Sequence, residues 1–378
     1  MGAPSCGSAR TLPDSGPTGR EPVTAHDPTR RTFALPAPTP PRSVGIWLLA
    51  CAGMVFAMVV IGGITRLTGS GLSMVEWRPV LGFLPPLSEE AWQRVFDLYR
   101  ATPQYLEVNA GMSLPEFRGI FWWEYIHRVW GRLIGLVFFV PFLWFLLRGY
   151  VRGPFAWKLA GLFVLGGAQG ALGWYMVKSG LVDVPEVSQY RLTAHLSLAF
   201  LIHALLVWTA LSVLFPERRA VSDGKFLSIR RLAHIALALV AITIVSGAFV
   251  AGTDAGFTYN TFPLMDGRIV PPGYFDTAMA PFEDIATIQF HHRVLALLTF
   301  AVLMVVWWRS RWLALVPRAR LAANLLGLAA IVQVVLGITT LLLVVPVSLG
   351  AAHQGGAVIL LTAVTWFVYE LRPPKPRG

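Results

Sequence analysis

The segment FWWEYIHRVWGRLIG, residues 121–135, places a glutamate, a histidine and two arginines at the start of an apolar run. Ionisable side chains are costly in a bilayer and usually serve a function where they occur. The core of this segment, EYIHRV (124–129), returns later in the chain as QFHHRV (289–294). The return indicates a duplicated chain that uses the same polar positions twice.

The composition around these segments indicates a membrane protein. Of the 378 residues, 55% are hydrophobic and 13% are charged, whereas soluble domains contain about 25% charged residues. Apolar runs of about 20 residues recur, which is long enough to cross a bilayer as helices. Because the alternation typical of barrel strands is absent, the sequence predicts an all-α integral membrane fold. The eight expected transmembrane helices cover residues 44–65, 121–147, 156–178, 190–215, 231–252, 286–308, 319–345 and 347–370.

The charge distribution predicts the orientation in the membrane. The formal charge is +11, but Lys and Arg concentrate in alternate loops, so a nucleic-acid partner is not needed to explain it. Both termini are therefore expected on the cytoplasmic side of a bacterial inner (plasma) membrane, with the mitochondrial inner membrane as the alternative. Cys6 in the tail and Cys51 inside a span are not expected to form a disulfide.

The duplication extends over the whole helical region. Further matched pairs are GGITRLTGSGLS (62–73) with GAFVAGTDAGFT (247–258), AQGALGW (168–174) with VQVVLGI (332–338), and TAHLSLAFLIH (193–203) with AAHQGGAVILL (351–361). Each repeat contains four helices, so the copies share one orientation and form two pseudo-symmetric four-helix bundles. The expected organisation is a disordered cytoplasmic arm (1–43), an N-terminal bundle (44–216) with an external loop (66–120), a cytoplasmic linker (217–230), a C-terminal bundle (231–370) and a tail (371–378). Within the external loop an amphipathic helix on the membrane surface is expected.

Four histidines lie at matched positions near the outer ends of the even-numbered helices: His127, His195, His292 and His353. One histidine on each of two helices in a bundle is a familiar arrangement for haem iron. Zinc would require three or four ligands, and the sequence contains no such close cluster. A proton relay would leave the duplication unexplained. His291 is the alternative to His292, and the two side chains point about 100° apart on a helix.

Three arginines near the outer surface are candidate ligands of the haem propionates: Arg66, Arg128 and Arg293. Carboxylates of this kind need cations near the water interface. The alternative for each arginine is interfacial snorkelling.

Glu124 breaks the symmetry of the two repeats, because the matched residue is Gln289. A carboxylate beside a haem can accept a proton or stabilise positive charge, and an amide cannot. Arg66 is likewise matched by Ala251. If one pocket does chemistry and the other passes electrons, the first half is therefore the chemical one. The structural alternative for Glu124 is an ion pair with Arg128, one turn further along the helix.

Together the segments EYIHRVWGRLIG, TRLTGSGLSMVEWRP, QFHHRV, TAHLSLAFLIH and AAHQGGAVILL resemble the haem A synthase family, in this order and over nearly all of residues 44–370. The external loop is similar to the form found in mitochondria and alphaproteobacteria. Members from other bacteria carry cysteine pairs in external loops. Because this chain has none there, a thiol-based step of those relatives cannot operate here.

The resemblance implies that the C8 methyl group of haem O is oxidised to the formyl group of haem A by successive hydroxylations, which supplies haem A for terminal oxidases. It implies that His127 and His195 hold the substrate haem, that His292 and His353 hold a haem b cofactor, and that Glu124 is catalytic. The partners to expect are haem O synthase, an electron acceptor or donor protein, assembly factors of cytochrome c oxidase, and the lipid bilayer.

Two other functions would use the same histidines. A quinol-linked, bis-histidine electron-transfer cytochrome of the b type would place its ligands at two depths, whereas all four are expected on one side here. A haem carrier would bind the same group without chemistry, and composition alone does not separate it from an enzyme.

Overall fold

The computed structural model describes residues 2, 40–76, 83–180, 187–217 and 224–373. Within these residues the regular secondary structure is helical, and the one β-type pairing is an isolated bridge between Met265 and Arg268. Eight helices of this part are long and apolar enough to cross a membrane, as predicted. They are α1 (Arg42–Leu67), α4 (Leu114–Leu147), α5 (Gly153–Gly180), α6 (Gln189–Leu214), α7 (Gly224–Gly252), α9 (Ile285–Ser310), α10 (Pro317–Leu342) and α11 (Val347–Glu370). Most of the predicted arm and tail, residues 218–223 of the predicted linker, and Cys6 lie outside the described residues.

Two helices, α4 and α7, begin well before the start that the sequence predicts. Helix α4 starts at Leu114 instead of residue 121, because Ser113 and Glu116 form a capping box and Pro115 lies in the first turn. Helix α7 starts at Gly224, so the second part of the predicted linker is helical. The hydropathy pattern misses both starts because the added turns contain polar residues.

The external segment packs on the extended start of α4. Helix α2 (Glu89–Arg100) is amphipathic, as expected, and is followed by the short helix α3 (Pro103–Glu107). Its apolar residues Trp92, Phe96 and Tyr99 form a buried cluster with Phe117 and Phe121 of α4. The apolar face of α2 is therefore covered by protein, which differs from the expected surface helix facing lipid.

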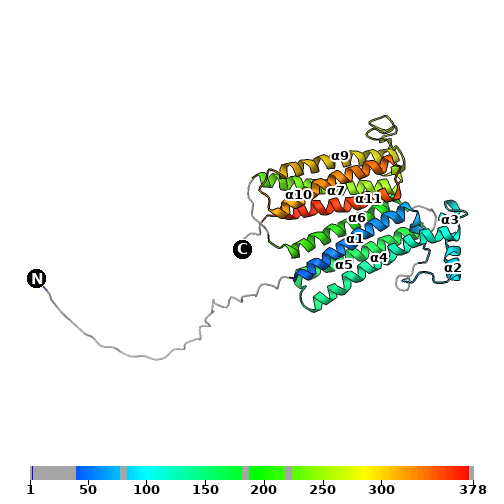
Figure 1. Cartoon of the computed structure of the whole chain (residues 1–378), viewed down its shortest axis with the longest axis horizontal. Helices are drawn as coiled ribbons and strands as arrows, with labels where there is room; N and C mark the ends of the chain where they lie inside the picture. Colours follow the sequence, from blue (N-terminus) through cyan, green and yellow to red (C-terminus); the bar gives the residue numbers. More distant parts are fainter. Residues whose placement is uncertain (1, 3–39, 77–82, 181–186, 218–223, 374–378) are drawn as a thin grey trace, which may run out of the picture. The chain divides into compact units, whose positions relative to one another are not determined.

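The helix contacts are compatible with two four-helix bundles. Helix α1 contacts α4 and α6, and α5 contacts α6, whereas α9 contacts α7 and α10, and α10 contacts α11. One buried cluster draws mainly on the first four of these helices, and a second draws mainly on the last four. Helices α1 and α6 also pack against α11, and α6 packs against α7, so the two halves share a wall (Figure 1).

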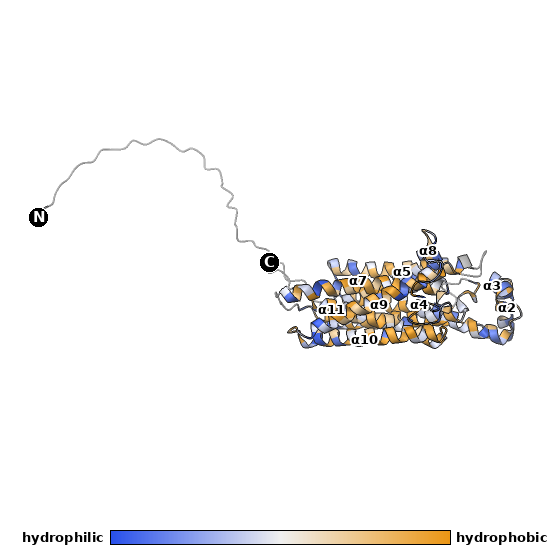
Figure 2. Ribbon diagram, turned by 90° about the horizontal axis from the view of Figure 1, so that it is seen from above, coloured by the Kyte–Doolittle hydropathy of each residue, from blue (hydrophilic) through white to orange (hydrophobic). Residues whose placement is uncertain are grey.

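The duplication is visible in the loops that follow α1 and α7. Each helix is followed by a residue with left-handed backbone, Gly69 (φ 63°) or Asp254 (φ 53°), and then by a short 3-10 helix. These are η1 (Ser70–Leu72) and η2 (Ala255–Phe257). Figure 1 shows α2, α3 and the segment between α7 and α9 at the same end of the long helices. Apolar residues colour the middle of these helices in Figure 2, and hydrophilic residues gather near their ends.

A tight turn joins α10 to α11, as predicted at Pro346, which is the N-cap of α11. Helix α10 ends at Leu342, because Val344 and Val345 take left-handed backbone with φ of 59° and 53°. This conformation costs roughly 1–2 kcal/mol for each residue that is not glycine.

Candidate functional site

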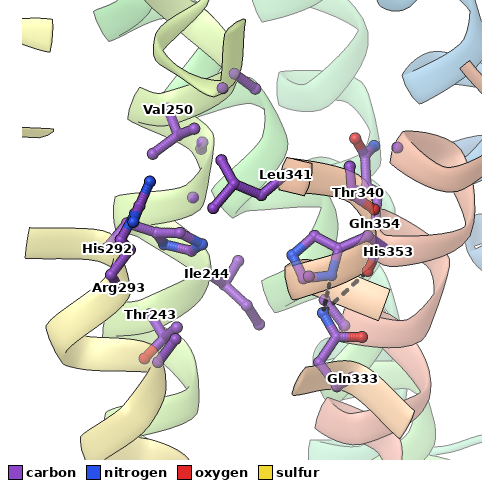
Figure 3. Close-up of a pocket in the computed structure, with 18 of the residues that line it drawn as sticks. Thr243, Ile244, Val250, His292, Arg293, Gln333, Thr340, Leu341, His353 and Gln354 are labelled. Atoms are coloured by element: carbon purple, nitrogen blue, oxygen red, sulfur yellow. Dashed lines mark hydrogen bonds between the residues drawn. The ribbon is translucent and has the colours of Figure 1, made fainter. Parts of the chain in front are cut away.

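A cavity of about 290 Å³ lies among α1, α6, α7, α9, α10 and α11. His292 of α9 and His353 of α11 are on opposite sides of it, and their imidazoles point toward one another (Figure 3). Most of the remaining wall is apolar. Among the described residues no three His, Cys, Asp or Glu side chains form a metal-binding cluster. Two opposed imidazoles are therefore the donor set that this cavity offers.

Each imidazole of the cavity is held by a polar side chain of a neighbouring helix. Ser246 Oγ lies 2.8 Å from His292 Nδ1. Gln333 Nε2 donates to the backbone carbonyl of His353 (3.0 Å) and lies 3.2 Å from its Nδ1. The ring planes are thus fixed by Ser246 behind the cavity wall and by Gln333 within it.

The first half repeats much of this arrangement around His127 and His195. Gln169 Nε2 donates to the carbonyl of His195 (3.0 Å), as Gln333 does at His353, and lies 3.2 Å from Nε2 and 3.3 Å from Nδ1 of the His195 ring. His127 and His195 are close enough for a charge on one ring to act on the other, as are His292 and His353. The structure thus brings the predicted histidines together in the predicted pairs.

A glycine on an adjacent helix lies against each of the four imidazoles. A methyl group built on the glycine would lie within 2.8–3.2 Å of the ring, which is closer than side chains normally pack. The pairs are Gly62 with His127 (3.2 Å), Gly173 with His195 (3.0 Å), Gly247 with His292 (3.0 Å) and Gly337 with His353 (2.8 Å). The four glycines lie at matched positions of the repeats, and this shared spacing is the sequence signal that could have identified them as part of the site.

Glu124 is buried, and three donors surround its carboxylate. Oε2 accepts from Ser73 Oγ (2.7 Å) and from the backbone N–H of Met74 (2.6 Å). Oε1 pairs with Arg128, which also donates to the carbonyls of Met74 (2.8 Å) and Glu76 (3.3 Å). The ion pair named above as the alternative is therefore present. It ties α4 to the loop after α1, and Glu124 lies three residues before His127 in α4.

The second half builds the same network with a neutral amide. Gln289 Nε2 donates to the carbonyl of Ala255 (2.7 Å), and Gln289 Oε1 accepts from Arg293 (3.0 Å). Arg293 also donates to the carbonyl of Thr261 (2.8 Å), the counterpart of Glu76. The network thus keeps its shape without the charge. Arg293 lines the cavity, and its buried Nε has no hydrogen-bond partner among the described residues.

Arg66 lines the cavity of the other half of the chain. Its guanidinium donates to the carboxylate of Asp254 (2.9 and 3.0 Å) and to the carbonyl of Ala251 (3.2 Å). Arg66 and Asp254 both belong to the wall that encloses His292 and His353. The comparison of Arg66 with Ala251 therefore does not mark the first half as the chemical one.

The remaining histidines of the described region lie outside the cavity. His291 bonds Tyr274 (3.1 Å) in the external segment. His203 is buried and bonds the carbonyl of Ala52 (3.1 Å) and the hydroxyl of Thr362 (2.7 Å). His234 is exposed near the start of α7. Of the adjacent histidines of α9, His292 is the one that faces its matched partner.

Known proteins match this chain over both halves. The family model described as cytochrome oxidase assembly protein, COX15-CtaA, matches residues 45–365. The chain belongs to this family. The matched range, residues 45–365, contains all four paired histidines, Glu124 and the three predicted arginines.

Individual relatives are similar over most of their length. The chain is 52% identical over 350 residues to the "Heme A synthase" of Nitrosospira multiformis, covering 91% of this chain and 96% of the relative. It is 54% identical over 333 residues to that of Paramagnetospirillum magneticum, covering 87% and 94%. It is 47% identical over 348 residues to "Heme A synthase COX15" of Arabidopsis thaliana, covering 88% and 75%. The predicted resemblance is confirmed.

The close approach of Gly337 to His353 gives a first test of the site. Replacing Gly337 by alanine is expected to push the imidazole out of line and to weaken haem binding there by about tenfold or more. The measurement is haem content of the purified variant. Gly166→Ala on α5 is the control, because a methyl group there meets nothing within 4 Å. Equal haem content in both variants would contradict the close contact.

Proposed function

We propose that the protein is a haem A synthase, which oxidises the C8 methyl group of haem O to the formyl group of haem A. The observation that carries the proposal is the pair of opposed imidazoles of His292 and His353 in an apolar cavity. The same glycine contacts are repeated at His127 and His195. Relatives with about half of their residues identical are named for this activity. A pure electron-transfer cytochrome and a haem carrier are not favoured, because these relatives are named as synthases and neither alternative makes haem A.

The cavity suits a porphyrin. Imidazole nitrogens are good ligands of iron, and two of them on opposite walls can hold a flat ring between them. The apolar wall matches the faces of the ring, and the unpartnered Nε–H of Arg293 is a donor for a propionate. Arg66, already paired with Asp254 at this wall, can supply a second cation.

The two sites are assigned different haems. His127 and His195, in the half that carries Glu124, hold the substrate haem O, whereas His292 and His353 hold a haem b cofactor. Arg128 holds Glu124 and the loop after α1 in place at the substrate site. The haem b cofactor supplies one-electron transfer. The residues around it fix its ring and keep water away from its faces.

The chemistry at the substrate must release electrons and protons. Conversion of the methyl group and one water to the formyl group releases four electrons and four protons, in two hydroxylations followed by loss of water from the gem-diol. If His127 and His195 both bound the iron of the substrate, they would leave it no open position for oxygen activation of the usual kind. We infer that the substrate first loses two electrons and one proton of the C8 methyl group, and that a water molecule then adds to this carbon and gives up a proton. An electron acceptor takes up the electrons.

Glu124 is the group assigned to that step. Its carboxylate is anchored by Arg128, Ser73 and the Met74 backbone, so its position does not depend on the substrate. A fixed negative charge near the ring stabilises developing positive charge, and a carboxylate can also accept a proton from the attacking water. Gln289 at the matched position keeps the scaffold but offers neither function.

The proposed setting is the inner membrane, with both termini on the cytoplasmic side and the histidines near the outer side. The basic loops support this orientation through the positive-inside rule. Haem O synthase, an electron-transfer protein and oxidase assembly factors are the proposed partners.

The function is tested by supplying haem O to the purified protein with an electron acceptor and extracting the haem. Haem A, or haem O hydroxylated at C8, is the expected product. If the first hydroxylated product is collected before exchange occurs, its oxygen is expected to come from ¹⁸O-labelled water. Label from ¹⁸O₂ in the product would contradict the water route. Unchanged haem O in an intact, haem-loaded protein would contradict the proposed haem A synthase activity.

A further inference from the structure

Ser246 of α7 forms two short hydrogen bonds that restrict where the proton of His292 lies. Its hydroxyl lies 2.8 Å from the Thr243 carbonyl and 2.8 Å from His292 Nδ1. A carbonyl can only accept, and a serine has one proton to donate. Both bonds are satisfied together only if Ser246 donates to Thr243 and Nδ1–H of His292 donates to Ser246. The lone pair of Nε2 is then free for a metal.

No hydroxyl group among the described residues hydrogen-bonds the rings of the other three histidines. At His353 and His195 the neighbouring group is an amide nitrogen, Gln333 Nε2 or Gln169 Nε2, which can only donate. The same nitrogens donate to the backbone carbonyls of these histidines, which fixes the direction of each amide. No hydrogen bond reaches the His127 ring from the described residues. Among the described residues, His292 is therefore the histidine of the four whose Nδ1 faces a hydroxyl group.

The repeat explains why His127 differs from His292. The residue of α1 that matches Ser246 is Ile61, which has no hydrogen-bonding side chain. The rings also turn different edges toward their glycines. His292 presents Cε1 and Nδ1 to Gly247, whereas His127 presents Nε2 and Cδ2 to Gly62. The position of Ser246 is thus a second difference between the halves, in addition to Glu124 and Gln289.

We propose that Ser246 is a positioning residue that makes His292 the permanent anchor of the second-half haem, and that Ile61 leaves the first-half haem easier to release. The inference rests on the proposed function, in which the first site must exchange substrate for product while the second keeps its cofactor. A ligating histidine whose other nitrogen donates to an oxygen is oriented by that bond and becomes a stronger ligand. Retention of haem at the second site and exchange of haem at the first then follow from the difference between Ser246 and Ile61.

The test measures haem release from the full-length protein loaded with haem B, using transfer to excess apomyoglobin. A His127→Ala background restricts the measurement to the second site, and a His292→Ala background restricts it to the first. Release from the second site is expected to be slower than from the first. Ser246→Ala is expected to speed release from the second site about tenfold and to raise its midpoint potential, because the ligand donates less charge to iron.

Two further variants separate this role from helix packing. Ser212→Ala in α6 removes a hydroxyl with the same bond to the carbonyl three residues earlier (2.7 Å to Thr209) but no histidine contact, and it is expected to change neither quantity. Ser246→Thr keeps the hydroxyl and is expected to stay close to the parent. Unchanged release and potential in Ser246→Ala, or equal changes in Ser212→Ala or Ser246→Thr, would overturn the proposal. A protein that binds haem at both sites but makes no haem A would refute the proposed function, while these release rates would still decide the role of Ser246.

Discussion

Replacing Glu124 by glutamine is expected to lower the rate of haem O oxidation by about 100-fold or more, with haem content unchanged. The substitution removes the fixed negative charge and the proton-accepting oxygen but keeps the size of the side chain. The measurement is conversion of haem O per bound haem, which separates a catalytic loss from a loss of substrate binding.

The protein itself shows that glutamine fits this position. In the second half Gln289 accepts from Arg293 and donates to the carbonyl of Ala255, which keeps the helix tied to its loop. Glu124→Gln can adopt that arrangement with Arg128 and the carbonyl of the matched residue Ser70. Glu116→Gln is the control, because glutamine also serves in a capping box. Full activity of the Glu124 variant would show that the ion pair with Arg128 is its whole role, and loss of haem would show a structural role.

Removing either imidazole of the cavity is expected to have an effect of similar size on cofactor binding. His292→Ala and His353→Ala are each expected to lose the haem of the second half, because a single remaining imidazole cannot clamp the ring from both sides. The readouts are haem content and the low-spin spectrum of the purified protein, with a folded variant verified by its melting transition.

Two histidines outside the cavity provide controls for this loss of haem. His291 adjoins His292 in the chain but bonds Tyr274 outside the cavity, and His234 is exposed in the first half of α7. Alanine at either position is expected to leave haem content unchanged. Loss of haem in His291→Ala but not in His292→Ala would reassign the ligand of α9.

Much of this architecture could be predicted from the sequence. Long apolar runs identify the spans because the bilayer requires them, and the repeated histidines identify the pairs because duplication preserves position. The start of α4 at Leu114 could not be read from hydropathy, since it depends on the capping residues Ser113 and Glu116. The covered face of α2 depends on that same extension of α4, so the two errors have one cause.

The site was harder to predict than the fold. The pairing of His292 with His353 follows from the repeat, but the direction of Arg66 depends on how the two halves pack, which no local pattern encodes. Ser246 could not be recognised from the sequence, because its role depends on its two hydrogen bonds, one to the Thr243 carbonyl and one to the His292 ring. The sequence provides a hint only in the contrast with Ile61.

The wall that α1 and α6 contribute to the cavity limits how the chain could have arisen. Gly63, Leu67, Leu196 and Phe200 of the first repeat close the side of the cavity that faces away from α9 and α10. A C-terminal repeat produced alone would expose that side to lipid. An ancestor with one repeat per polypeptide would therefore have needed a second copy of the chain to complete its pocket. Fusion of the two copies would then have joined the two repeats covalently.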